Sequence, residues 1–124
     1  DDMIAINVNN NMHIIKTTLG VVRKVEATAK KSLTEILSSA GTLAVDDMLI
    51  YISLGADDPK AFISDAYEDE ELGHQGVFDK FVEYIYAMRY PTMKKEEAEE
   101  YEAKKILETE KRASELLGLQ ETKD

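Results

Sequence analysis

The chain has 124 residues and a formal net charge of −10 at pH 7, with 44% hydrophobic and 32% charged residues. This length and balance predict one globular domain with a core of its own. The negative charge argues against a nucleic-acid binder, and no apolar run approaches the ~20 residues that span a bilayer. Cysteine is absent, which excludes disulfides and thiolate metal sites.

Two short strands are expected at the start of the chain. Residues 3–8, MIAINV, alternate loosely between apolar and polar, and MHIIKT at 12–17 has a similar character. The run NNN at 9–11 between them is typical of a turn, because Asn tolerates left-handed backbone angles. The pattern predicts a β-hairpin.

Two helices are expected next. Thr17 or Thr18 is a candidate cap for a helix from Leu19 to about Lys30, and SLTE at 32–35 is a capping box that opens a short helix ending near Gly41. The apolar face expected for the first helix consists of Leu19, Val22, Val25 and Ala29, at spacings of three and four.

The segment VDDMLIYISLG at 45–55 contains five consecutive apolar residues, and periodicity alone does not distinguish helix from strand here. We predict a helix, because Asp46 and Asp47 suit a helix N-terminus and Gly55 suits its end. In the following LGADDPKAF, Asp58 before Pro59 is the usual start of another helix. Its expected stripe is Ala61, Phe62, Ala66 and Tyr67.

Residues 68–76 are expected to form an acidic loop, and residues 77–90, VFDKFVEYIYAMRY, a strong amphipathic helix. Pro91 and Thr92 break the chain before a long polar helix that begins near Met93 and frays beyond Leu117. The prediction is therefore a mainly α fold: a short N-terminal hairpin, a compact bundle of about five to six helices, and a long polar C-terminal helix. The expected division is a helical core with the hairpin at 1–92 and a charged helix and tail at 93–124.

The sequence contains no constellation that identifies an enzyme or a cofactor. Glu71 and His74 form a single Glu-x-x-His, whereas di-iron bundles use two such motifs, and His13 has no acid three residues before it. Asp57 does not open a calcium loop, because the sixth position is Phe62 instead of glycine. There is no Gly-x-Ser-x-Gly and no phosphate-binding glycine loop. We therefore expect no catalytic, cofactor-binding or metal-binding residue.

A candidate surface for a protein partner lies in YIYAMRYPTM at 84–93. Met and Tyr adapt to partner surfaces and are common at interfaces. We expect Tyr84, Met88, Tyr90 and Met93 to form one edge of an exposed apolar groove. The alternative is that the C-terminal helix covers these side chains.

Charge is distributed unevenly. Residues 16–31 hold five basic residues against Glu26 alone, and residues 57–83 hold nine acids against Lys60 and Lys80. Such a layout can orient partners or copies of the same chain, or it can simply keep the surface solvated. It also permits a second function, in which an acidic inhibitor or adaptor mimics nucleic acid and binds a basic partner.

Three stretches resemble the tail assembly chaperones of long-tailed (siphovirus-type) bacteriophages. MIAINVNNNMHIIKTTLGVVRKVE is similar to that family's extended opening followed by an apolar-basic helix, and LIYISLGADDPKAF is similar to its helix, Gly-Asp-Pro-like turn and helix. The acidic Glu-Lys helical end is also in keeping with the family. Together these stretches span about two-thirds of the chain. The length of the last polar helix departs from the pattern.

The resemblance implies a small, mainly helical viral chaperone that acts in the cytoplasm of the infected bacterial host. It would coat the helical tape measure protein before tail tube subunits polymerise around it, and would self-associate as a homo-oligomer. The resemblance implies no catalytic residue, and the composition separately predicts no nucleic-acid partner and no membrane.

Overall fold

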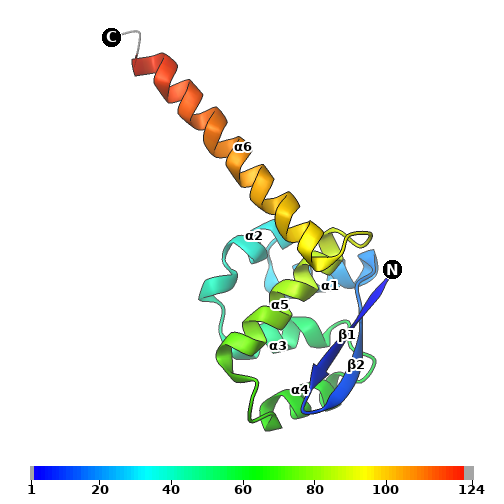
Figure 1. Cartoon of the computed structure of the whole chain (residues 1–124). Helices are drawn as coiled ribbons and strands as arrows, with labels where there is room; N and C mark the ends of the chain where they lie inside the picture. Colours follow the sequence, from blue (N-terminus) through cyan, green and yellow to red (C-terminus); the bar gives the residue numbers. More distant parts are fainter. Residues whose placement is uncertain (1, 122–124) are drawn as a thin grey trace. The chain divides into compact units, whose positions relative to one another are not determined.

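The computed structural model describes the backbone of residues 2–121 and the side chains of residues 2–118. Within these residues, a two-stranded hairpin is followed by six α-helices, so the predicted mainly α fold with an N-terminal hairpin and a long last helix is confirmed (Figure 1). The elements are β1 (Met3–Val8), β2 (Asn11–Lys16), α1 (Leu19–Ala29), α2 (Leu33–Ser38), a 3-10 turn (Ala40–Thr42), α3 (Val45–Ser53), α4 (Pro59–Glu68), α5 (Gly73–Arg89) and α6 (Lys95–Glu121).

The chain divides into two compact units, Asp1–Thr92 and Met93–Asp124. The first unit contains the hairpin and α1 to α5, and the second contains α6. Pro91 lies next to this division, where a proline lacks the amide that would continue a helix.

The hairpin closes through a two-residue turn. β1 and β2 pair antiparallel with Val8 opposite Asn11, and Asn9 and Asn10 have φ angles of 52° and 62°. Two consecutive left-handed residues are what a tight hairpin turn requires, because this geometry matches the twist of the strands. Asn11, which the sequence placed in the turn, instead begins β2.

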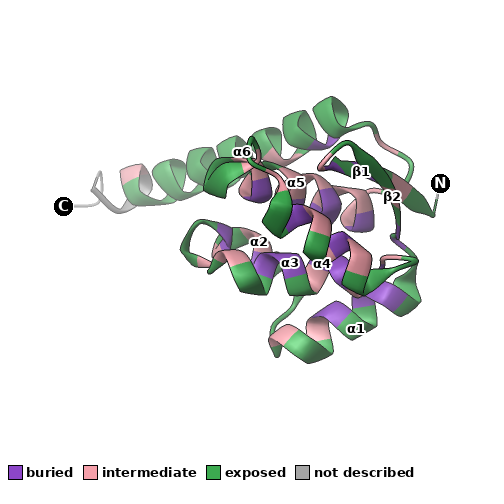
Figure 2. Cartoon of the chain, turned by 90° about the horizontal axis from the view of Figure 1, so that it is seen from below, coloured by how far each residue is buried: buried purple, intermediate pink, exposed green. Residues whose placement is uncertain are grey.

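The core of the first unit lies between the hairpin and the helices α1 to α5. Figure 2 shows buried residues on the facing sides of these elements. The largest fully buried side chains are Tyr84, Phe62, Phe81, Ile15, Ile36, Met48, Ile52, Ile85, Val8 and Val25. Because they come from both strands and from helices α1 to α5, the elements share one core.

The predicted helix starts at 32 and 58 are confirmed. The Ser32 hydroxyl accepts from the Glu35 amide at 3.2 Å, and the Glu35 carboxylate accepts from the Ser32 amide, which completes the capping box. Asp58 accepts from the Ala61 amide at 3.1 Å, and Pro59 occupies the first helical position. The helical reading of residues 45–53 is also confirmed.

We expect the variant Asp58→Ala to lose about 1 kcal/mol of unfolding free energy, since the free amides at the start of α4 lose their acceptor. The loss should be the same with and without calcium in urea denaturation. Asp57→Ala is the matched control, because Asp57 is an exposed neighbouring carboxylate. If calcium stabilised the wild type but not Asp58→Ala, the capping role would be wrong.

Two predicted helix faces need correction. Leu19 is 75% exposed, and the buried side of α1 consists of Val21, Val22 and Val25. Thr18 precedes α1 without a capping hydrogen bond from its side chain. On α4, Tyr67 is 61% exposed and donates its hydroxyl to Asp46 at 2.6 Å. In each helix, one residue at the edge of the predicted apolar stripe is exposed: Leu19 in α1 and Tyr67 in α4. The rotation of each helix against the core decides which edge of the stripe is buried.

α5 begins at Gly73 and not at Val77, so the expected loop at 68–76 is shorter than predicted. Gly73 has a φ angle of 62°, a left-handed conformation that glycine adopts without a steric penalty. A Cβ atom on Gly76 would lie 2.9 Å from Leu72 Cδ1, which shows how closely Leu72 covers this glycine. The glycines that suggested a loop therefore serve the start of a helix.

Candidate functional site

The four residues predicted to bind a partner do not form one exposed edge. The Tyr84 side chain is completely buried and Met88 is 6% exposed, so the expectation that they are exposed is wrong for these two residues. Tyr90 is half-buried at the end of α5. Met93 belongs to the second unit, where it is also half-buried. The physical reason is the rotation of α5, which directs Phe81, Tyr84, Ile85 and Met88 into the core.

The Tyr84 hydroxyl is unusual among the described side chains, because it is buried and no described residue hydrogen-bonds to it. Burial raises the pKa of this phenol well above its ordinary value of 10.0, because the phenolate is disfavoured away from water. A buried polar group without a partner lowers the stability of the fold by roughly 1–3 kcal/mol.

We expect Tyr84→Phe to raise the unfolding free energy by about 1 kcal/mol, since it removes this hydroxyl and keeps the ring. Chemical denaturation of both proteins measures the difference. Tyr84→Leu tests the ring itself and should destabilise the protein. A Tyr84→Phe variant less stable than the wild type would mean that the hydroxyl has a stabilising partner.

An apolar hollow lies where the start of α1 meets the end of α5. It has a volume of about 270 Å³ and is lined by Asp2, Thr17, Thr18, Leu19, Val22, Met88 and Pro91. Leu19 is the most exposed large apolar side chain in the described part of the chain. Of the four predicted residues, Met88 lines this hollow. Sequence reasoning missed Leu19 as a surface residue, although its place at the first position of α1, after Thr17 and Thr18, is compatible with exposure.

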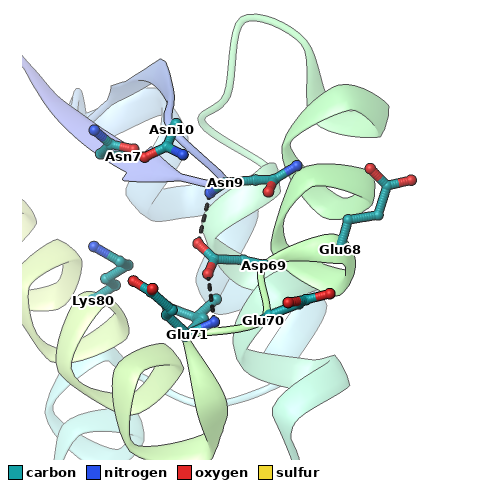
Figure 3. A pocket seen from close by; sticks show the side chains of 9 residues that line it. Asn7, Asn9, Asn10, Glu68, Asp69, Glu70, Glu71 and Lys80 are labelled. Atoms are coloured by element: carbon teal, nitrogen blue, oxygen red, sulfur yellow. Dashed lines mark hydrogen bonds between the residues drawn. The ribbon is translucent and has the colours of Figure 1, made fainter.

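A second hollow, polar and open, lies beside the hairpin turn (Figure 3). It has a volume of about 630 Å³ and is lined by Asn7, Asn9, Asn10, Glu68, Asp69, Glu70, Glu71, Leu72 and Lys80. Asp69 accepts from the backbone amides of Asn9 at 2.6 Å and Glu71 at 3.0 Å. These amides lower the pKa of Asp69, because they stabilise the carboxylate. Asp69 therefore connects the turn to the loop before α5.

His13 and Asp65 connect the hairpin to α4. His13 Nε2 lies 2.6 Å from Asp65 Oδ2, and the two side chains are 11% and 17% exposed. The His13 ring also meets Phe62 edge-on, with centroids 5.5 Å apart. The hydrogen bond from His13 is the main cause that lowers the pKa of Asp65 below 3.8, and Asn11 Nδ2 adds a second bond at 3.1 Å.

The lowered pKa of Asp65 predicts an acid-sensitive contribution to stability. A carboxylate whose pKa is lower in the folded chain stabilises the fold above its unfolded pKa, and this stabilisation is lost as the pH falls through the folded pKa. We expect Asp65→Asn to be less stable than the wild type at pH 7 and to lose less stability on acidification below pH ~4. Asp57→Asn removes the same charge from an exposed position and serves as the control. Equal acid profiles for the wild type and Asp65→Asn would contradict this role.

The histidines are placed differently. His13 pairs with Asp65, whereas His74 is exposed in the first turn of α5. In the part of the chain that the structure describes, no group of three or more His, Asp or Glu side chains is placed to hold a metal ion. Among the same residues, no helix has the length and hydrophobicity of a membrane span.

α6 is exposed along most of its described length (Figure 2), and its exposed residues include several large apolar side chains. The most exposed are Ile106, Leu107, Leu116 and Leu117, at 56%, 63%, 58% and 59%. Tyr101 is 40% exposed, and Lys105 Nζ lies 4.8 Å from its ring centroid. α6 is thus a charged helix that also exposes apolar side chains to solvent.

Among the described residues, the apolar hollow, the polar hollow and the exposed apolar side chains of α6 are therefore candidates for contact with a binding partner. No protein-family model matches this chain, and neither a curated protein nor a solved structure matches it significantly.

Proposed function

We propose that this protein is a non-enzymatic tail assembly chaperone of a bacteriophage, which binds the helical tape measure protein during tail morphogenesis. The observation that carries the proposal is the apolar hollow at Leu19, Val22 and Met88. A chaperone for an amphipathic helix needs an apolar groove that accepts side chains spaced along one helix face. The proposed site of action is the cytoplasm of the infected bacterium.

Leu19 is the proposed anchor for the client. It is 75% exposed, and covering an apolar side chain of this size stabilises a complex by roughly 1.5–3 kcal/mol. Such a contact is weak alone, but many copies bound along one long client would gain from avidity. The net charge of −10 would keep the coated client soluble, because like-charged complexes repel one another.

Co-expression with a tape measure protein tests the proposal. The wild-type chain should keep this client in solution and copurify with it, whereas Leu19→Ser should copurify much less. Ile50→Ser is the matched control, because Ile50 is also exposed, at 42%, but does not line the hollow. If the wild-type chain bound no tape measure fragment, the proposal would be wrong. If Leu19→Ser bound the client as well as the wild type does, the apolar hollow would not be part of the interface.

The polar hollow supports a second candidate function, an acidic inhibitor or adaptor that mimics nucleic acid. Glu68, Glu70 and Glu71 are exposed around it and form a negative surface. A basic partner would bind there with strong salt dependence, since exposed charges are screened by ions. The role of Asp69 in holding the hairpin turn gives part of this cluster a local explanation. Partner binding that does not change with salt would exclude this candidate.

A further inference from the structure

The two edges of the hairpin differ in their hydrogen bonding. The outer edge of β2 is paired within the fold, because the Lys16 amide donates to the Gly55 oxygen. On the same edge, the Ile14 oxygen accepts from the Asp57 amide. In an antiparallel pair, residues whose backbone groups point away from the partner strand lie opposite each other. The residues of β1 that pair with Ile14 and Lys16 therefore also direct their amides and oxygens outward, along the other edge of the hairpin.

The outer edge of β1 is formed by Met3, Ala5 and Asn7, which are all exposed. Among the described residues, no hydrogen bond reaches the outward amides and oxygens of these three. Proteins usually protect such an edge with a charged side chain, a proline or a bulge. β1 has the sequence MIAINV, without charge or proline, and its six residues pair one to one with β2 without a bulge. The edge can therefore serve as a template for another strand.

The outer face of the hairpin beside this edge is apolar. Met3 and Ala5 of β1 share this face with Met12 and Ile14 of β2, because directly opposed residues point to the same side of a sheet. Met3 is 47% exposed, Ile14 36% and Met12 60%. Successive side chains of a strand point to opposite faces, so every second residue of an added strand would lie on this face. Those residues should be apolar, and the flexible methionines can adapt to their shapes.

The polar hollow adjoins the end of β1, where Asn7 belongs to its lining (Figure 3). Three exposed carboxylates, those of Glu68, Glu70 and Glu71, surround the hollow. Lys80 is the one cation in its lining. This excess of negative charge would attract a basic side chain at the corresponding end of an added strand.

We propose that β1 accepts an extended segment of a different protein as a third strand, antiparallel to β1. The segment has lysine or arginine beside the polar hollow, followed by alternating apolar and polar residues. The antiparallel direction is favoured because this pairing is more stable per residue than parallel pairing. β1 of a second copy does not fit this description, since pairing Ala5 with Ala5 would place its Asp2 opposite Val8, next to the acidic hollow. The proposal concerns the hairpin alone and does not rest on the chaperone function.

A designed peptide that begins with lysines and continues as alternating valine and threonine tests the proposal. Amide hydrogen exchange of the full chain is followed by NMR at low salt, with and without the peptide. The peptide should slow exchange at Ala5 and Asn7, whose amides would donate to the new strand. Exchange at Ile6 should not change, because this amide already belongs to the ladder with β2. The same peptide with glutamates in place of lysines should bind about tenfold more weakly or worse.

Changes to the backbone separate strand addition from simple side-chain contact. Ala5→Pro removes an outward amide and no ladder bond, so it should raise the dissociation constant of the peptide about tenfold or more. Ala5→Thr keeps the amide and should bind as the wild type does. A peptide N-methylated at the amides that face β1 should also lose binding, whereas methylation of the alternate amides should not. This peptide pair decides the question with the wild-type chain even if Ala5→Pro does not fold.

Three results would overturn the proposal. The first is unchanged exchange at Ala5 and Asn7 at millimolar concentrations of the lysine peptide. The second is equal binding of the two N-methylated peptides. The third is slow exchange at Ala5 without peptide, which would mean that the edge is already paired. Because no tape measure protein is present, these outcomes are separate from those of the Leu19 experiment.

Discussion

The variant Gly55→Ala is expected to lose about 3 kcal/mol of unfolding free energy, because the core has no space for its methyl group. A Cβ atom at this position would lie 2.4 Å from the backbone oxygen of Lys16, 3.0 Å from the Tyr84 hydroxyl and 3.1 Å from Ile15 Cγ2. The nearest atom belongs to the backbone, so no side-chain rotation relieves the contact. The chain around Gly55 must therefore move away from β2.

That movement would break hydrogen bonds that connect the segment between α3 and α4 to the hairpin. The Lys16 amide donates to the Gly55 oxygen at 2.7 Å, and the Asp57 amide donates to the Ile14 oxygen at 3.2 Å. Urea denaturation of Gly55→Ala measures the loss, and amide exchange at Lys16 should rise with it. Gly41→Ala is the control, since no atom lies within 4 Å of a Cβ atom there. Similar stabilities for both variants would contradict the close approach at Gly55.

Replacing Phe62 by alanine should lower the unfolding free energy by about 3–5 kcal/mol, the usual effect of removing a buried aromatic ring. Phe62 is completely buried on α4, and its ring lies nearly perpendicular to the His13 ring, at an interplanar angle of 83°. The variant therefore leaves a cavity and also removes the support that positions His13 beside Asp65. We expect the acid-sensitive stabilisation by Asp65 to weaken as well.

Tyr67→Ala on the same helix is the comparison for Phe62→Ala. Tyr67 is 61% exposed, so its loss should change stability by less than about 1 kcal/mol despite its bond to Asp46. Thermal and urea unfolding of the two variants give the ranking. If Tyr67→Ala were as destabilising as Phe62→Ala, the assignment of Phe62 as buried and Tyr67 as exposed would be wrong.

The sequence predicted features that depend on neighbouring residues. The Ser32–Glu35 capping box and the Asp58 cap involve residues three positions apart, and both are present. The helix at 45–53 and the Asn turn of the hairpin also follow from local preferences. These elements are determined mainly by short-range chemistry, so a single sequence is sufficient to predict them.

Features that depend on distant residues were not predictable in this way. The contact between His13 and Asp65 joins residues 52 positions apart, and no local sequence pattern around either residue predicts it. Leu19 and Tyr84 both belong to apolar segments of the sequence. In the structure, Leu19 is 75% exposed, whereas Tyr84 is fully buried. That difference depends on how each helix is rotated against the core, which periodicity fixes only approximately. The predicted groove failed for this reason, and the apolar hollow was missed for the same reason.

The hydrogen bonds between β2 and residues 55–57 have a consequence for synthesis of the chain. Ribosomes add about 5–20 residues per second, so the hairpin emerges some seconds before the segment that completes its edge. During this interval the outer backbone groups of Ile14 and Lys16 remain unpaired, and the nascent strand is open to pairing with another chain. Slowing translation after residue 17 should therefore increase misassembly during biosynthesis, even though the finished fold would be unchanged.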